Sequence, residues 1–191
     1  MAARKSDRAV RARAEDPRDA RAQSPGAAEI VAPRKVLDAK AARLAAGDLL
    51  SRRAWTRAEL TTRLRRRGAP PDVAGDVVAD LAARGYVDDA SYARHWVNTR
   101  ASRGYGIARL RAELRARGVA SAIIDAALGE VDAASSLTRA RETARRRLPA
   151  LRRGRPERLA PRLRDYLLRR GFAASIVMRV VRECAGVTAE D

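Results

Sequence analysis

The chain has 191 residues, of which 46% are hydrophobic, 34% charged and only 4% aromatic. It can bury a core, but this composition argues against one thick globule and favours slender helical layers. Lys and Arg number 41 against 23 Asp and Glu, and the net charge of +18 predicts a polyanionic partner. The single cysteine, Cys184, excludes an intramolecular disulfide framework. With no apolar run of membrane length and no signal-peptide pattern, we expect a cytoplasmic protein with no membrane partner.

Residues 1–35 mix Arg, Ala, Asp, Pro and Gly with hardly any large apolar side chains. Such a segment cannot offset the entropy lost on ordering, so we predict a disordered basic tail. It holds nine basic and five acidic residues, so most of the excess positive charge lies in the rest of the chain.

A short pattern occurs three times after the tail: two leucines four residues apart and a glycine four residues later. The three copies are Leu60, Leu64, Gly68; Leu110, Leu114, Gly118; and Leu163, Leu167, Gly171. Apolar residues, or Cys184, recur five, nine, ten and thirteen positions after each glycine, which follows one face of a helix. We therefore predict an all-α fold of three tandem three-helix repeats, 36–87, 88–131 and 132–186, with a C-terminal tail at 187–191. Stacked units of this kind predict an elongated, curved body.

In the first repeat, a leading helix should begin near Val36 and end near Arg53. Its imperfect apolar stripe comprises Leu37, Leu44, Leu49 and Leu50. Thr56 and Glu59 have the spacing of a capping box, in which the hydroxyl and the carboxylate each satisfy a free amide. Pro70 and Pro71 then suit the first turn of a third helix, which should end near Gly85.

In the second repeat, Asp88 should cap a helix that ends before a break at Gly104, Tyr105 and Gly106. Tyr92 and Trp96 lie four residues apart and favour core packing, whereas His95, the only histidine, favours the surface. The third repeat should begin near Ala133. It has a longer loop around residues 154–156, because its glycine follows Gly118 by 53 residues rather than 50.

Arginines on the second helix of each repeat should point away from the core. If the leucines face inward, the helical period places six arginines outward: Arg65, Arg66, Arg111, Arg115, Arg164 and Arg169. Stacked repeats would align them in a basic stripe suited to a phosphate backbone. Arg67, Arg117 and Arg170 precede the repeat glycines and have a competing role, since a cation in the last helical turn offsets the helix dipole.

No catalytic pattern stands out. The sequence lacks a phosphate-binding Gly-rich loop, a metal-ligand cluster and a Cys/His or Ser/His pairing, so we predict no enzyme, no catalytic residue, no cofactor and no metal site.

Residues 85–97 read Gly-Tyr-Val-Asp-Asp-x-x-Tyr-Ala-x-x-Trp-Val, and residues 100–114 read Arg-x-x-Arg-Gly-Tyr-Gly-x-x-Arg-Leu-x-x-Glu-Leu. This string resembles the RecX family of regulatory proteins. The resemblance spans about residues 40–186 and is strongest in the second repeat. It implies a modulator, usually an inhibitor, of the RecA recombinase that binds the RecA filament on single-stranded DNA. The same string contains the further candidate binding residues Arg100, Arg103 and Arg109. Tyr105 is also a candidate, because an aromatic ring near basic residues can stack on a base. Tyr105 and Trp55 both lie thirteen residues before a repeat glycine, however, and this equivalence favours packing.

Such a protein would be a monomer when free and would limit the growth of the filament, its ATP hydrolysis, strand exchange and coprotease activity. Two alternatives remain open. One is an independent helical DNA-binding or architectural protein, although no helix stands out as a recognition helix. The other is a helical adaptor whose charge serves solubility, with the arginines reflecting genomic base composition.

Overall fold

The computed structural model describes residues 36–131 and 133–185, and the predicted tails at 1–35 and 187–191 lie outside this range. The described residues form nine α-helices and one short 3-10 turn, with no strand among them. This confirms the predicted all-α fold. None of the described helices is both long enough and apolar enough to span a membrane.

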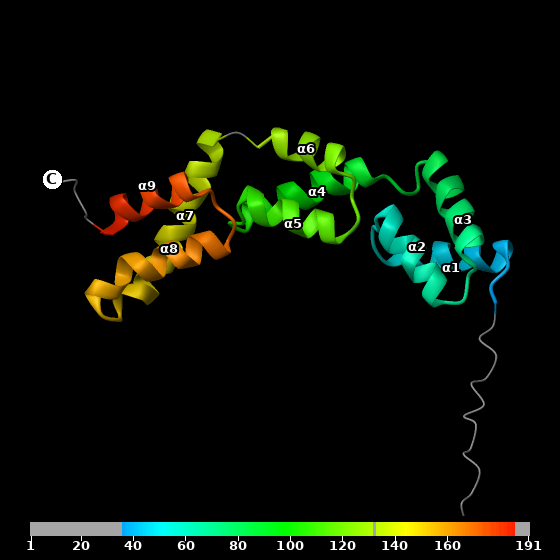
Figure 1. Cartoon of the computed structure of the whole chain (residues 1–191), viewed down its shortest axis with the longest axis horizontal. Coiled ribbons are helices and arrows are strands. Elements are labelled where there is room, and N and C mark those ends of the chain that lie inside the picture. The colour runs from blue at the N-terminus through cyan, green and yellow to red at the C-terminus, as the bar shows by residue number, and fades with distance from the viewer. Residues whose placement is uncertain (1–35, 132, 186–191) are drawn as a thin grey trace, which may run out of the picture. The chain divides into compact units, whose positions relative to one another are not determined.

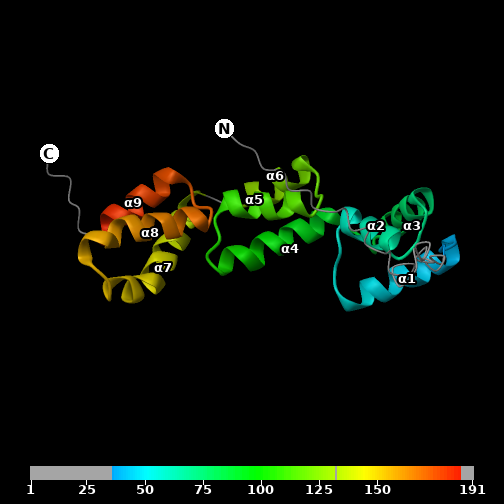
Figure 2. The same cartoon turned by 60° about the horizontal axis from the view of Figure 1, so that its bottom comes forward.

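The helices form three consecutive groups of three, which we call modules 1, 2 and 3 (Figure 1). Module 1 contains α1 (Ala39–Arg52), α2 (Arg57–Arg66) and α3 (Pro71–Ala83). Module 2 contains α4 (Asp89–Ser102), α5 (Ile107–Ala116) and α6 (Ser121–Gly129). Module 3 contains α7 (Ala133–Arg152), a 3-10 turn η1 (Pro156–Arg158), α8 (Leu159–Arg169) and α9 (Ala174–Ala185). Figure 2 shows the three modules from a second side.

Each module has its own hydrophobic core rather than a share in one common core. The repeat leucines of α2, α5 and α8 lie at the centre of these cores and are inaccessible to solvent. The glycine after each pair ends its helix in the left-handed region, with φ of 104° at Gly68, 74° at Gly118 and 86° at Gly171. The sequence pattern thus corresponds to one structural unit, a helix with a buried leucine pair and a glycine stop.

The predicted stripe of α1 is wrong at Leu44, whose side chain is 70% exposed. Ala42, Ala46 and Leu49 face the core of module 1 instead. Leu44 lies two residues from Ala42, which rotates it about 200° around the helix and away from that face. The prediction placed Leu44 on the buried face because leucine is large and apolar. The core-facing positions are instead occupied mostly by alanines, whose small side chains allow α1 to pack closely against its neighbours.

The predicted capping box at α2 is half right. The Thr56 hydroxyl accepts a hydrogen bond from the Glu59 amide at 3.1 Å, as expected for an N-cap. The Glu59 carboxylate, however, is bound by Arg53 and Arg117 rather than by the Thr56 amide. The other predicted helix ends are confirmed: Pro71 opens α3, Asp88 caps α4, and the extra length before α8 holds the η1 turn.

Candidate functional site

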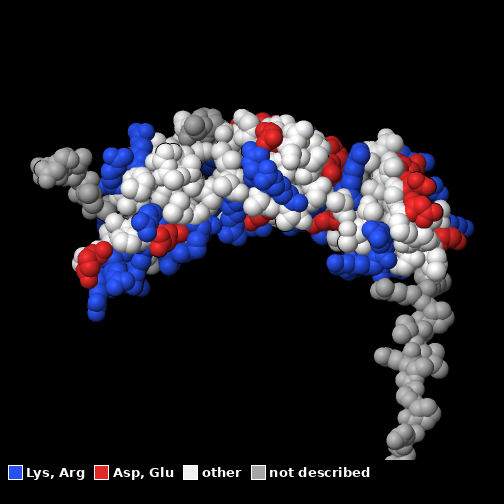
Figure 3. All heavy atoms as spheres, in the orientation of Figure 1, with Lys and Arg blue, Asp and Glu red and all other residues white. Residues whose placement is uncertain are grey.

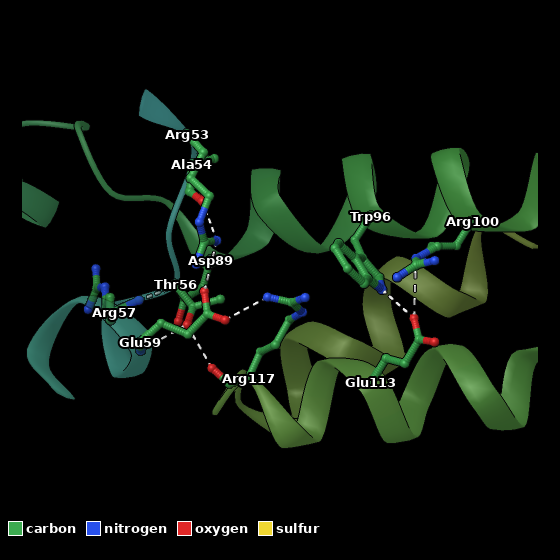
Figure 4. Close-up of polar contacts among 10 residues, drawn as sticks. All are labelled: Arg53, Ala54, Thr56, Arg57, Glu59, Asp89, Trp96, Arg100, Glu113 and Arg117. Atoms are coloured by element: carbon green, nitrogen blue, oxygen red, sulfur yellow. Dashed lines mark hydrogen bonds and ion pairs between the residues drawn. The ribbon is translucent and has the colours of Figure 1, made fainter. Parts of the chain in front are cut away.

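The N-terminal end of α2 in module 1 meets the C-terminal end of α5 in module 2, and we call this contact the first junction (Figure 4). The Thr56 hydroxyl donates to the Arg117 carbonyl oxygen at 2.6 Å. The Arg57 amide donates to Oδ1 of Asp89, a buried carboxylate at the start of α4, at 2.9 Å. The Asp89 and Thr56 side chains thus give hydrogen-bond partners to a free amide at the start of α2 and a free carbonyl at the end of α5. The acidic Asp89 also suits the positive end of the α2 dipole.

An ion pair between modules reinforces this junction. Glu59 and Arg117 approach to 2.6 Å, with side chains that are 21% and 26% exposed. The Arg117 guanidinium also lies 4.0 Å from the ring centroid of Trp96, which itself stacks with Tyr92. Arg117 therefore does more than offset the α5 dipole, because it joins two modules.

A basic cleft of about 490 Å³ lies beside the first junction. Its charged lining consists of Arg53, Arg63, Arg66, Arg115 and Arg117, with Glu59 as the only carboxylate among the lining residues. Glu59 is already engaged by Arg117 and, at 3.5 Å, by Arg53. Within the described range, no carboxylate forms an ion pair with Arg63 or Arg115. An anion entering this cleft would thus meet the Arg63 and Arg115 guanidinium groups, which form no ion pair with any described carboxylate.

The N-terminal end of α5 meets the C-terminal end of α8 in module 3, and we call this contact the second junction. Here the backbones bond directly: the Gly106 amide donates to the Arg170 carbonyl at 2.8 Å and the Ala108 amide to the Gly171 carbonyl at 3.1 Å. A Cβ on Gly106 would collide with the backbone of Gly171. Glycine at this position is what allows the two helix ends to touch.

Arginines surround one aromatic ring at the second junction. The guanidinium carbons of Arg109, Arg170 and Arg100 lie 4.6, 4.9 and 5.4 Å from the centroid of Tyr105. We call Tyr105 and these three arginines the Tyr105 cluster. Glu113 is the counter-ion present, at 3.0 Å from Arg109 and 3.4 Å from Arg100. The cluster keeps a net positive charge.

A smaller basic cleft of about 290 Å³ lies within module 3. Arg147, Arg162 and Arg169 line it together with Tyr166 and one acid, Asp165. Arg147 lies 5.4 Å from the Tyr166 ring, so this cleft also combines arginines with an aromatic face. Lys and Arg side chains are spread over all three modules on the visible face, with acidic side chains between them (Figure 3).

Family models for two RecX domains match this chain, the first three-helix domain at residues 42–81 and the second at residues 88–128. The regulatory protein RecX of Mycolicibacterium vanbaalenii is 40% identical over 140 residues, covering 70% of this chain and 76% of that protein. The regulatory protein RecX of Thermobifida fusca is 43% identical over 137 residues, covering 71% and 74%. The chain belongs to the RecX family.

Two crystal structures of RecX proteins share the fold. The structure of RecX from Lactobacillus salivarius has a TM-score of 0.68 at 19% identity and covers 78% of this chain and 97% of its own. Another structure of regulatory protein RecX has a TM-score of 0.69 at 22% identity and covers 74% and 72%. The predicted resemblance to the RecX family is thereby confirmed.

The structure gathers some of the predicted binding residues and separates others. Arg66 and Arg115, predicted from different repeats, line the same cleft at the first junction. Arg100, Tyr105 and Arg109 meet in the Tyr105 cluster. Arg169 lines the cleft of module 3.

The remaining predicted residues lie elsewhere. Arg65 and Arg103 are exposed. Arg111 is half-buried and forms an ion pair with Asp125, so it points outward less freely than predicted. Arg164 pairs with its neighbour Asp165 at 3.2 Å.

Six further arginines in these sites were not predicted as binding residues: Arg53, Arg63, Arg117, Arg147, Arg162 and Arg170. Arg63 left no signal in the repeat comparison, because its counterparts are Glu113 and Tyr166. Arg117 and Arg170 did stand at equivalent positions before glycines, but a dipole role explained them equally well. Their partners are distant in sequence, which no local pattern reveals.

Two predictions about single side chains are confirmed. His95 is exposed, as expected. Cys184, whose place thirteen residues after Gly171 predicted the apolar face of the last helix, is half-buried against the core of module 3, where burial raises the pKa of its thiol. Among the described residues, no group of three or more His, Cys, Asp and Glu side chains is placed to hold a metal ion.

Proposed function

We propose that this protein is a non-enzymatic modulator of the RecA recombinase. It binds the RecA filament on single-stranded DNA as a monomer in the cytoplasm. By binding there it limits growth of the filament, ATP hydrolysis, strand exchange and coprotease activity. Membership of the RecX family and the names of its relatives, regulatory proteins, support this proposal.

The observation that carries the proposal is the basic cleft at the first junction, where Arg63 and Arg115 from two modules line one opening and pair with no acid in the described part of the chain. The Tyr105 cluster and the cleft of module 3 add further cationic sites along the chain. A partner built from repeated protomers and a phosphate backbone presents repeated acidic groups to such a series of sites. Several modest contacts on one chain then raise the overall affinity without a deep pocket.

The cleft can be tested through the salt dependence of binding. Replacing Arg63 and Arg115 together by Ala should weaken binding to a single-stranded oligonucleotide. If both residues contact phosphates, the slope of log affinity against log salt should shrink by about 1.4. Fluorescence anisotropy across a salt series measures this slope. Arg94→Ala, which removes an exposed arginine of α4 outside the sites described, is the matched control.

An unchanged slope in the double variant would exclude the cleft as a phosphate-binding surface.

The function itself is tested by adding the purified protein, in less than stoichiometric amounts, to RecA hydrolysing ATP on single-stranded DNA. We expect hydrolysis to fall and filaments to shorten. No change in either quantity rejects the proposal. Tight, sequence-selective binding to duplex DNA would instead favour the architectural alternative.

A further inference from the structure

One position near the start of the second helix of a repeat carries an acid at the first junction and a base at the second. Glu59 and Arg109 are fifty residues apart and occupy the same place in α2 and α5, while Arg117 and Arg170 both precede a repeat glycine. At the first junction the equivalent pair is acid with base, Glu59 with Arg117 at 2.6 Å. At the second junction it is base with base, Arg109 with Arg170, and both guanidinium groups lie against Tyr105.

The positive charge at the second junction is only partly balanced. Three guanidinium carbons lie within 5.4 Å of the centroid of the Tyr105 ring, so three positive charges share one aromatic side chain. Glu113 contacts Arg100 and Arg109. The Arg170 guanidinium instead donates to the Arg103 carbonyl at 2.9 Å, which satisfies a hydrogen bond without neutralising its charge.

We propose that a phosphate group of single-stranded nucleic acid binds the Tyr105 cluster, between Arg109 and Arg170, and supplies the negative charge that Glu59 supplies at the first junction. Guanidinium groups suit phosphate oxygens geometrically, and an aromatic ring beside them suits an unpaired base. This inference deepens the proposed function and rests on it, because it names the ligand of one basic site.

Binding at this place has a structural consequence. Arg109 belongs to module 2 and Arg170 to module 3, so a phosphate held by both tightens the second junction. The Gly106 and Ala108 amides donate across that junction, and their hydrogen exchange therefore reports its opening. Ligand binding and the closure of the junction are linked, so each favours the other.

Amide hydrogen exchange of the full chain, followed by NMR, tests the inference with a short oligothymidylate as the probe. We expect exchange at Gly106 and Ala108 to slow by about tenfold when the probe is bound, the effect of one charge-assisted contact. Inorganic phosphate, compared with chloride at equal ionic strength, should slow it in the same direction. An oligothymidylate that leaves both amides unchanged overturns the inference.

The variant Arg109→Glu reproduces the charge pattern of the first junction. It should show slowed exchange at Gly106 and Ala108 without any probe and should no longer respond to oligothymidylate. Arg94→Glu makes the same change in net charge at an exposed site of the same module and should respond like the wild type. If Arg109→Glu fails to fold, Arg109→Gln carries the test, and its response should be clearly reduced.

A full response in the Arg109 variants would overturn the inference. So would slowing by polyglutamate but not by oligothymidylate, since the partner would then be an acidic protein segment. The recombinase assay separates this inference from the proposed function. A protein that leaves RecA unaffected but still shows Arg109-dependent slowing retains the phosphate site and loses only the proposed role.

Discussion

The first and second junctions join the same kinds of helix ends with different chemistry. At the first, side chains mediate the contact. The Thr56 hydroxyl donates to the Arg117 carbonyl oxygen, the Asp89 carboxylate accepts from the Arg57 amide in the first turn of α2, and Glu59 forms an ion pair with Arg117. At the second, Gly106 stands in place of Thr56, and two backbone hydrogen bonds join α5 directly to α8. A repeat therefore fixes where helices end and meet, while individual residues decide what holds the ends together.

The two junctions also differ in where the acidic residue that balances their arginines lies. The side-chain junction carries its own counter-charge, Glu59, on the N-terminal turn of α2. The backbone junction has Arg109 at that position, and the acid is moved one turn along α5 to Glu113, where it binds Arg100 and Arg109. Across the first junction the charge of Arg117 is balanced by Glu59, whereas no described carboxylate forms an ion pair with Arg170 at the second.

The largest effect should come from the glycines at the junctions. Gly171→Ala should lower the free energy of unfolding by about 3 kcal/mol, because a Cβ there meets the Arg109 backbone and the φ of 86° is itself unfavourable for alanine. Gly118→Ala should have a comparable cost, since its Cβ meets the Ala58 methyl group, which is fixed to the α2 backbone and cannot rotate away. Chemical denaturation measures both.

Gly85→Ala is the control for this series. Gly85 has a similar φ of 78°, but no atom lies within 4 Å of its Cβ position, so it reports the conformational cost alone. That cost is about 1 kcal/mol. Equal losses at Gly85 and Gly171 would contradict the close helix contact at the second junction.

Double-mutant cycles should give couplings of opposite sign at the two junctions. For Glu59→Gln with Arg117→Gln we expect an attractive coupling of about 1 kcal/mol, because both side chains are mostly shielded from water. For Arg109→Gln with Arg170→Gln, in the absence of nucleic acid, we expect a weak repulsion of about 0.5 kcal/mol. Added salt should reduce both values. An attractive coupling at the second junction would remove the contrast on which the phosphate site depends.

The smallest expected effect on stability is at Asp48 of α1. Arg67, the counterpart of Arg117 and Arg170, forms an ion pair with this residue inside module 1 rather than across a junction. Hydrogen bonds from Arg52 and then Arg67 hold the pKa of Asp48 below its ordinary value of 3.8. The folded state thus favours the charged carboxylate. The resulting stability is fully present above that pH and is lost as the pH falls through the lowered value.

Acid unfolding of Asp48→Asn compared with the wild type measures this contribution. The variant should be slightly less stable at neutral pH, and the difference should vanish in strong acid. A difference that persists in strong acid would show that Asp48 acts by something other than its charge.

Local patterns explain which parts of the fold were predictable. The period of the leucines and the glycines that follow them predicts α2, α5 and α8 and their ends, because helix formation and a left-handed stop depend on neighbouring residues. In α1 the same reasoning held for Leu37, Leu49 and Leu50 but failed at Leu44, which is exposed while two alanines face the core. In a helix with few large apolar residues, close packing rather than side-chain size decided the buried face.

The sequence by itself determined three helical modules, the helices that carry most of the basic residues, and the resemblance to the RecX family. Only the tertiary structure decided which arginines are neutralised and which are open. Arg117 meets Glu59 across 58 residues of sequence, and Arg170 meets the Arg103 carbonyl across 67. The state of each guanidinium depends on which distant carboxylate the packing of the modules brings near, and helical periodicity carries no information about that distance.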